Sequence, residues 1–175
     1  MDGIGDAVDT GHGPMSQPTD ITVRVQAEDF DLGRELSLIR AGRSDIGALV
    51  SFSGLVRDAD AGGLVDMTLE HYPGMTEAAL RGIAADAAGR WPLHAALIIH
   101  RYGRLLPGDQ IMMVAAASRH RQAAFDAASF MMDYLKSRAP FWKCERTDDG
   151  AAWVDARETD EDALDRWQGA EERGH

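Results

Sequence analysis

Apolar residues alternate with polar ones along several stretches of the chain, which is the spacing of a strand with one buried face. Ile21, Val23 and Val25 show this alternation, and the apolar, partly β-branched stretch 46–58 predicts a buried strand. A loop rich in Asp and Gly separates it from a strand at 64–71, so we expect the two to form a hairpin with a mobile tip. The other strands are predicted at 94–105, 110–117, 141–146 and 151–157.

Two shorter stretches carry apolar residues at helical spacing. Residues 31–41 predict a helix with Leu32, Leu36 and Ile39 facing inward, and residues 75–91 predict a longer amphipathic helix closed by the following proline. A short helix is also expected around 163–167.

The longest predicted helix follows Ser118, which we interpret as its N-cap. Pro140 should end this helix at about Arg138 or Ala139, because proline disfavours helical geometry in the residue before it. Its predicted core face consists of Ala124, Phe125, Ala128, Met131, Met132 and Leu135.

The order of these elements favours an α+β fold with a mostly antiparallel sheet, hairpins and three or four helices. We expect five to seven strands in a single domain at 20–168. Residues 1–19 are rich in Gly, Asp and Pro and predict a disordered tail, and 169–175 predict a polar tail. Asp149-Gly150 predicts the turn of the last hairpin.

The charge and composition of the chain exclude several classes of protein. The formal net charge is −11, which argues against a general nucleic-acid binder. A single cysteine rules out an intrachain disulfide, and no run is apolar enough to cross a membrane. No phosphate loop, dinucleotide fingerprint or metal-ligand spacing is present, so we expect no metal and no cofactor. The acidic, Gly-rich N-terminus does not resemble a secretory signal, and we expect a cytoplasmic protein.

Lys136 and Lys143 are the only lysines among 18 basic Lys and Arg residues. Arginine stays protonated in proteins, whereas lysine can exchange a proton or act as a nucleophile once its surroundings lower its pKa. Two lysines within eight residues therefore suggest chemistry, although a coding bias toward arginine would also produce this pattern.

Other polar residues carry weaker signals. Arg119, His120 and Arg121 open the longest helix, where free N–H groups and guanidinium groups would suit a phosphate, although a solvated basic turn is an equal alternative. His100 lies in an apolar strand and is expected to be structural, as are Glu70 and His71. Cys144 is expected to be inert.

Four segments together resemble the large, catalytic subunit of molybdopterin synthase: TLEHYPGM, RYGRLLPGD, SRHRQAAFDA and MDYLKSRAPFWKCE. The resemblance runs from Ile21 to Trp167. It implies a hammerhead-like α+β fold and the conversion of cyclic pyranopterin monophosphate (precursor Z) to molybdopterin. The implied sulfur donor is a small, ubiquitin-like subunit with a C-terminal Gly-Gly thiocarboxylate. The implied assembly is a heterotetramer built on a dimer of large subunits.

The resemblance also implies site residues. Lys136 and Lys143 match the two catalytic lysines of the family. The implied substrate-binding residues are Val56, Arg57, His120, Arg121, Lys136, Lys143 and Glu145. Two positions depart from the family pattern. Leu55 lies where many members have a polar or basic residue, and Cys144 lies where many have Arg. The sulfur is not expected to pass through Cys144, because in the family it comes from the partner subunit.

Helix geometry adds a hypothesis about how these residues assemble. His120 and Lys136 are sixteen residues apart, or about 24 Å along one helix. One small pterin cannot contact both in a single chain, so we expect a pocket shared across a dimer. Two alternatives remain open: a non-catalytic module that binds a Gly-Gly tail, and an unrelated enzyme with a phosphate ligand.

Overall fold

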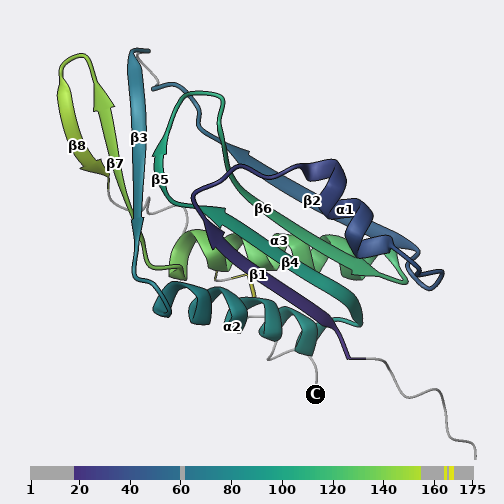
Figure 1. Ribbon diagram of the computed structural model, residues 1–175. Helices are drawn as coiled ribbons and strands as arrows, with labels where there is room; N and C mark the ends of the chain where they lie inside the picture. Colours follow the sequence, from purple (N-terminus) through teal and green to yellow (C-terminus); the bar gives the residue numbers. More distant parts are fainter. Residues whose placement is uncertain (1–17, 60–61, 155–163, 165, 168–175) are drawn as a thin grey trace, which may run out of the picture.

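The structure is a computed structural model that describes residues 18–59, 62–154, 164 and 166–167. These residues form eight strands in two sheets, with three helices (Figure 1). Most of the predicted N-terminal tail and the whole predicted C-terminal tail lie outside the described residues. Thr19, at the end of the predicted N-terminal tail, donates a hydrogen bond of 2.8 Å to Leu93 O and is therefore part of the fold.

The first sheet has the strand order β1-β4-β6-β2. Its members are β1 (Asp20–Gln26), β4 (Leu93–Arg101), β6 (Gln110–Ser118) and β2 (Ala48–Leu55). The β1–β4 pair is parallel and the other pairs are antiparallel. Strands β4 and β6 are apolar along nearly their whole length because both of their faces are covered.

Helices α2 (Met75–Arg90) and α3 (Arg121–Arg138) cover one face of this sheet, and α1 (Leu32–Arg40) covers the other (Figure 1). The α2 and α3 side contains the larger core cluster, and the α1 side a smaller one around Phe30 and Leu97. The predicted helices at 31–41 and 75–91 are thereby confirmed.

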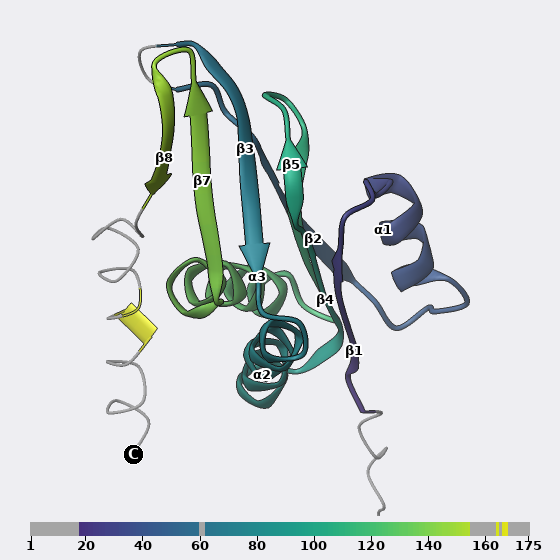
Figure 2. The same cartoon turned by 60° about the vertical axis from the view of Figure 1, so that its left-hand side comes forward.

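The second sheet is entirely antiparallel, with the order β5-β3-β7-β8. It consists of β5 (Gly103–Leu105), β3 (Leu64–His71), β7 (Phe141–Thr147) and β8 (Gly150–Val154). Figure 2 shows β3 and β7 rising away from α2 and α3. The predicted final hairpin is confirmed by the β7–β8 pair. Residues 155–157 of its predicted second strand lie outside the described residues.

The predicted hairpin between 46–58 and 64–71 is wrong. Strand β2 pairs with β6 in the first sheet, whereas β3 pairs with β5 and β7 in the second. The predicted strand within 46–58 is present as β2, but its predicted burial is wrong, because β2 lies at a sheet edge with Phe52 43% and Leu55 55% exposed. An apolar run does not by itself distinguish a central strand from an edge strand.

The predicted start and core face of the longest helix need correction. Ser118 ends β6 and is fully buried, with its hydroxyl donating to Pro92 O at 2.8 Å, while His120 is the N-cap residue of α3. Phe125 is 59% exposed, and Phe130 occupies the core instead. The other five predicted core positions of α3 are buried, and the helix ends at Arg138 as expected.

The strand count exceeds the predicted five to seven because the stretch 94–105 is not one strand. It breaks after Arg101 into β4 and β5, which belong to different sheets. Gly103 begins β5 with a φ of 87°, a left-handed value that favours glycine. None of the helices in the described ranges is both long and apolar enough to cross a membrane.

Candidate active site

The two lysines flank the connection between α3 and β7. Helix α3 ends at Arg138, and the Ala139 N–H closes it by donating to Leu135 O at 3.2 Å. Pro140 cannot continue the helix, and its carbonyl accepts from the Thr76 hydroxyl on α2 at 3.4 Å. The corner is thus fixed by the adjoining helix before β7 begins.

Lys143 lies on β7 with its side chain about one-third exposed, and its Nζ is 2.9 Å from Glu145 Oε1. Both residues occupy the same face of the strand, opposite Leu69 and Met67 of β3. Lys136 lies in the last turn of α3 and is exposed. The convergence of the two lysines on one cleft stays a prediction.

An aromatic stack fixes the start of β7. The Phe141 ring lies 3.7 Å from the His100 ring and nearly parallel to it, while His71 lies beside Phe141 and Tyr102. His100 is buried, and its Nδ1 lies 2.8 Å from Arg101 O, so that nitrogen carries the hydrogen. Burial lowers the pKa of His100 to about 4. The predicted structural role of His100 is therefore confirmed.

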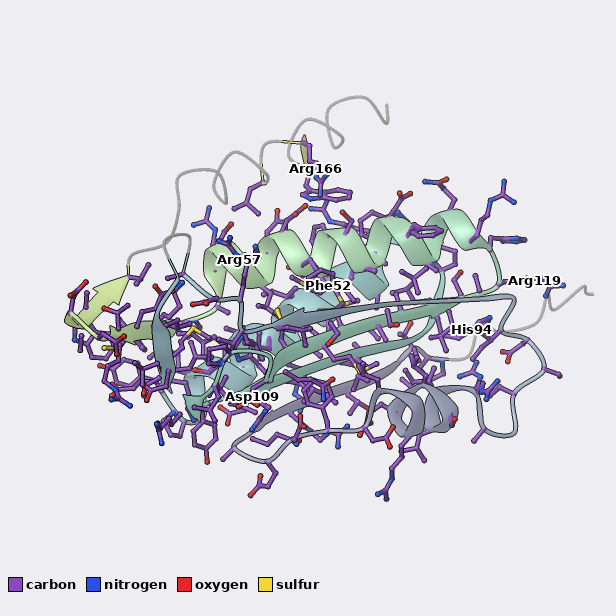
Figure 3. All side chains as sticks on the ribbon, turned by 90° about the horizontal axis from the view of Figure 1, so that it is seen from above. Phe52, Arg57, His94, Asp109, Arg119 and Arg166 are labelled. Atoms are coloured by element: carbon purple, nitrogen blue, oxygen red, sulfur yellow. The ribbon has the colours of Figure 1, made fainter. Side chains whose placement is uncertain are left out.

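Val56 and Arg57 lie near this end of the molecule. Both backbone groups of Val56 form hydrogen bonds with the turn that precedes β6. Its N–H donates to Asp109 O at 2.8 Å, and its carbonyl accepts from Gly108 N at 2.8 Å. Val56 is buried in a cluster under β3. Arg57 is exposed, and Figure 3 shows its side chain directed toward the C-terminal part of α3.

His120 and Arg121 lie at the opposite end of α3. Figure 3 shows the adjacent Arg119 at the far end of the sheet from Arg57. The His120 side chain does not cap the helix, and the first turn has no acidic residue, so the N–H groups of this terminus would suit an anion. With sixteen residues between His120 and Lys136, about 24 Å of helix separates them. A single chain therefore brings Val56 and Arg57 toward the lysine end but leaves His120 and Arg121 apart from it.

Asp66 is a residue that the sequence did not single out. It is 4% exposed on β3 and accepts hydrogen bonds from Arg104 on β5 and Arg146 on β7. Both guanidinium groups, Arg146 first, hold the pKa of Asp66 below its usual value. Its partners are 38 and 80 residues away, so no local pattern could have revealed the cluster.

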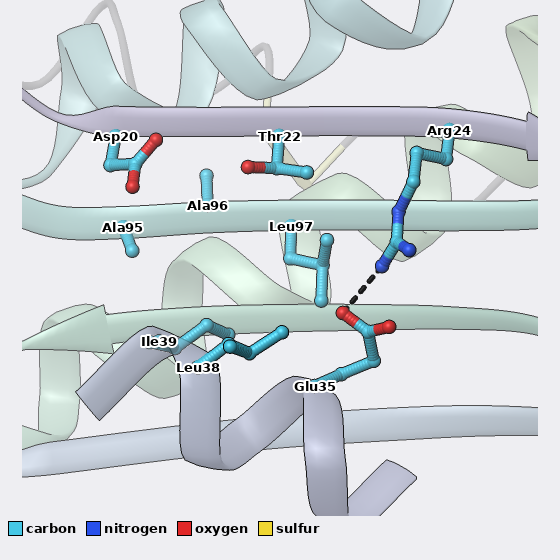
Figure 4. A pocket seen from close by; sticks show the side chains of 9 residues that line it. All are labelled: Asp20, Thr22, Arg24, Glu35, Leu38, Ile39, Ala95, Ala96 and Leu97. Carbon is cyan, nitrogen blue, oxygen red and sulfur yellow. Dashed lines mark ion pairs between the residues drawn. The ribbon is translucent and has the colours of Figure 1, made fainter. Parts of the chain in front are cut away.

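A hollow of about 200 Å³ lies elsewhere, between β1, β4 and α1 (Figure 4). Arg24 and Glu35 form an ion pair across it, and none of the predicted site residues lines it. Among the described residues, no group of three or more His, Cys, Asp or Glu side chains is arranged to hold a metal ion.

Comparison with known proteins gives a consistent result. The family model described as MoaE protein matches residues 25–138. The chain is 56% identical over 153 residues to the molybdopterin synthase catalytic subunit of Mesorhizobium japonicum, covering 86% of this chain and 96% of that relative. It is 61% identical over 147 residues to the molybdopterin synthase catalytic subunit of Ralstonia nicotianae, covering 83% and 84%. The solved molybdopterin biosynthesis MoaE protein of Burkholderia ambifaria has a TM-score of 0.74 and 55% identity, covering 85% of this chain and 98% of that one.

Proposed function

Since the chain belongs to the MoaE protein family, we propose that it is the catalytic subunit of a molybdopterin synthase. It is a sulfurtransferase of molybdenum cofactor biosynthesis that converts cyclic pyranopterin monophosphate to molybdopterin. Two sulfurs come from the C-terminal thiocarboxylate of a small, ubiquitin-like subunit. The bacterial biosynthetic relatives support a cytoplasmic location, which we also propose.

The observation that carries this proposal is the pairing of Lys143 with Glu145 beside the α3–β7 corner that holds Lys136. In each sulfur transfer a thiocarboxylate sulfur forms a bond to a pterin side-chain carbon. The carbon–oxygen bond at that carbon breaks, and the departing oxygen takes up a proton. Water then hydrolyses the acyl–sulfur bond, which frees the C-terminal carboxylate of the small subunit and leaves the sulfur on the pterin. An ammonium group can stabilise the developing negative charge and supply a proton, and a neighbouring carboxylate can orient it.

These residues receive separate roles in the proposal. Lys143 is the main proton-transfer and electrostatic group, and Glu145 orients it. Lys136 positions the substrate and the thiocarboxylate, and Arg57, beside the buried Val56, adds a fixed positive charge at the same end.

We place the pterin phosphate at His120 and Arg121 of a second copy of the chain. The helix start there suits an anion, and about 24 Å of helix prevents one chain from supplying both halves of the site. Exposed Phe52 on β2 and Phe125 on α3 leave apolar surface of the kind that a dimer buries. We therefore propose a homodimer of large subunits with one composite pocket at each end of the interface.

The small subunit is proposed to dock on the sheet that carries Lys143. Trp142 and Trp153 lie exposed on the face of β7 and β8 opposite to Lys143, and the exposed Tyr72 contacts Trp142 edge-on. Exposed aromatic side chains of this kind are typical of protein interfaces. A small subunit bound there would have its flexible Gly-Gly tail close to β7.

One reconstitution tests the function. The purified chain is incubated with precursor Z and a thiocarboxylated small subunit, and molybdopterin is measured by conversion to its fluorescent derivative. We expect product with the intact chain and a large loss with the Lys143→Ala variant. Binding of the small subunit without any product would instead identify a non-catalytic module for a Gly-Gly tail. Absence of both binding and product would overturn the proposal.

A further inference from the structure

Asp66 links three strands of the second sheet. Its carboxylate accepts from Arg104 Nε on β5 at 2.6 Å and from Arg146 Nε on β7 at 3.3 Å, and Arg146 makes a second contact through its terminal nitrogen. The Asp66 side chain is 5% exposed, whereas those of Arg104 and Arg146 are 62% and 48% exposed. A buried carboxylate is costly unless it is paired, so the two arginines keep Asp66 charged in place.

The position of Asp66 in the ladder matters for β7. The pairing of β3 with β7 shifts between Leu64, which lies opposite Thr147, and Asp66, which lies opposite Arg146. From Asp66 onward the register continues without a shift to the end of β3. Asp66 and Arg146 therefore form the first pair of the regular ladder, immediately after the irregularity.

Lys143 depends on this register. It lies opposite Leu69, three pairs further along, or about 10 Å from the Asp66 pair. A slip by one residue would turn Lys143 and Glu145 to the other face of the sheet. Strand β8, the other neighbour of β7, is a sheet edge, so β3 is the strand that relates β7 to the rest of the fold. Arg104 extends the link to β5, which follows directly from β4 of the first sheet.

We propose that Asp66, held by Arg104 and Arg146, is a positioning residue that fixes the register in which β7 presents Lys143 and Glu145. The proposal rests on the proposed function, because that function is what assigns Lys143 and Glu145 to the active site. Asp66 acts through β7 and contacts neither substrate nor thiocarboxylate.

The single cysteine of the chain provides a direct reporter of the register. Cys144 lies opposite Thr68, two residues beyond Asp66 on β3. The Cα atoms of opposite residues in antiparallel strands are about 4.5–5.5 Å apart, within the range that a disulfide spans. A Thr68→Cys variant should therefore form one intrachain disulfide under mild oxidation, which peptide mass spectrometry can identify and quantify.

In the Thr68→Cys background, Asp66→Asn and Asp66→Ala are expected to lower the disulfide yield several-fold. Arg104→Gln removes one of the two arginines and leaves Arg146 in place, so it should give an intermediate disulfide yield. This variant replaces the Asp66 variants in the test if those do not fold. Glu35→Gln is the matched control, because Glu35 is also a buried carboxylate paired with an arginine, Arg24, but lies on α1. The control should keep the full yield.

Kinetics of the reconstituted synthase, with Thr68 and Cys144 intact, provide the second readout. Asp66→Asn should lower kcat for molybdopterin formation at least tenfold with little change in KM for the pterin, because the phosphate is held elsewhere. Glu35→Gln should change neither constant. Parental disulfide yield and parental kcat in both Asp66 variants would overturn the proposal. If the parental synthase makes no molybdopterin, the proposed function fails, while the disulfide yield still decides whether Asp66 fixes the register.

Discussion

Lys143 Nζ lies 2.9 Å from Glu145 Oε1, with the two residues next to each other on one face of β7. Each side chain is about one-third exposed. Partly exposed ion pairs of this kind contribute little to folding, typically 0–1 kcal/mol. Under the proposed function the pair serves the chemistry of its ammonium group, so its substitution should affect activity far more than folding.

The first prediction concerns Lys143 itself. Lys143→Ala in the reconstituted synthase should lower kcat by about 10²- to 10⁴-fold, the range for loss of a proton-transfer group. The free energy of unfolding should change by less than about 1 kcal/mol. Lys143→Arg keeps the charge but does not release a proton, so it should bind the pterin as the parent does and still fail to restore turnover. Steady-state kinetics and urea unfolding measure the two effects. Full activity in both Lys143→Ala and Lys136→Ala would end the assignment of the lysines.

The second prediction tests the composite pocket. His120→Ala and Lys143→Ala subunits, each weakly active alone, should regain about half of the parental activity in mixed dimers, because one of the two pockets then contains no substitution. Differently tagged subunits allow the mixed dimer to be isolated before assay. The control is a mixed dimer of Lys136→Ala and Lys143→Ala subunits. Each of its two pockets lacks one lysine, so its activity should stay low. Verified His120→Ala/Lys143→Ala dimers without recovered activity would count against a shared pocket.

The sequence predicted the local elements well because their signals are local. A few neighbouring residues encode each of three features: the helical spacing of apolar residues in α1 and α2, the end of α3 before Pro140, and the turn before Gly150. The four segments that resemble a known family likewise pointed to the family that the comparisons show.

Long-range pairing could not be predicted in the same way. The short loop between β2 and β3 indicated a hairpin, but the two strands enter different sheets. Phe125 has the apolar character of a core residue, yet it is exposed because it lies to one side of the buried stripe of α3. The link from Asp66 to Arg146 joins residues 80 positions apart and is visible only once the second sheet is formed.

The third prediction is a pH dependence of stability that arises at His100. Burial lowers the pKa of His100 to about 4, below the ordinary value of 6.5 that it regains on unfolding. Between these two pH values the unfolded chain binds a proton that the folded chain does not. The contribution of neutral His100 to the free energy of unfolding is therefore fully present above pH 6.5 and is lost as the pH falls toward 4. The shift corresponds to about 3 kcal/mol.

A His100→Phe variant should lack this part of the acid sensitivity. At pH 7.5 it should be less stable than the parent, because Arg101 O loses its hydrogen-bond donor. Urea unfolding at pH 7.5, 6 and 4.5 measures both effects. A parent and variant whose stabilities change in parallel over this range would show that His100 is not the buried neutral group.

The last prediction concerns the helix start proposed to hold the pterin phosphate. A Cβ added at Gly47 would lie 2.3 Å from Arg119 O, a backbone atom that cannot rotate away, and the Gly47 N–H donates to Ser118 O at 3.1 Å. Gly47→Ala must therefore displace the chain immediately before His120. It should lower the free energy of unfolding by about 1–3 kcal/mol, as overpacking does, and raise KM for the pterin more than it lowers kcat. Gly82→Ala is the matched control, since the added Cβ on α2 meets open space and should leave KM unchanged while stabilising the helix by up to about 1 kcal/mol. A Gly47→Ala synthase with parental KM would show that the position of the α3 start does not govern binding of the pterin.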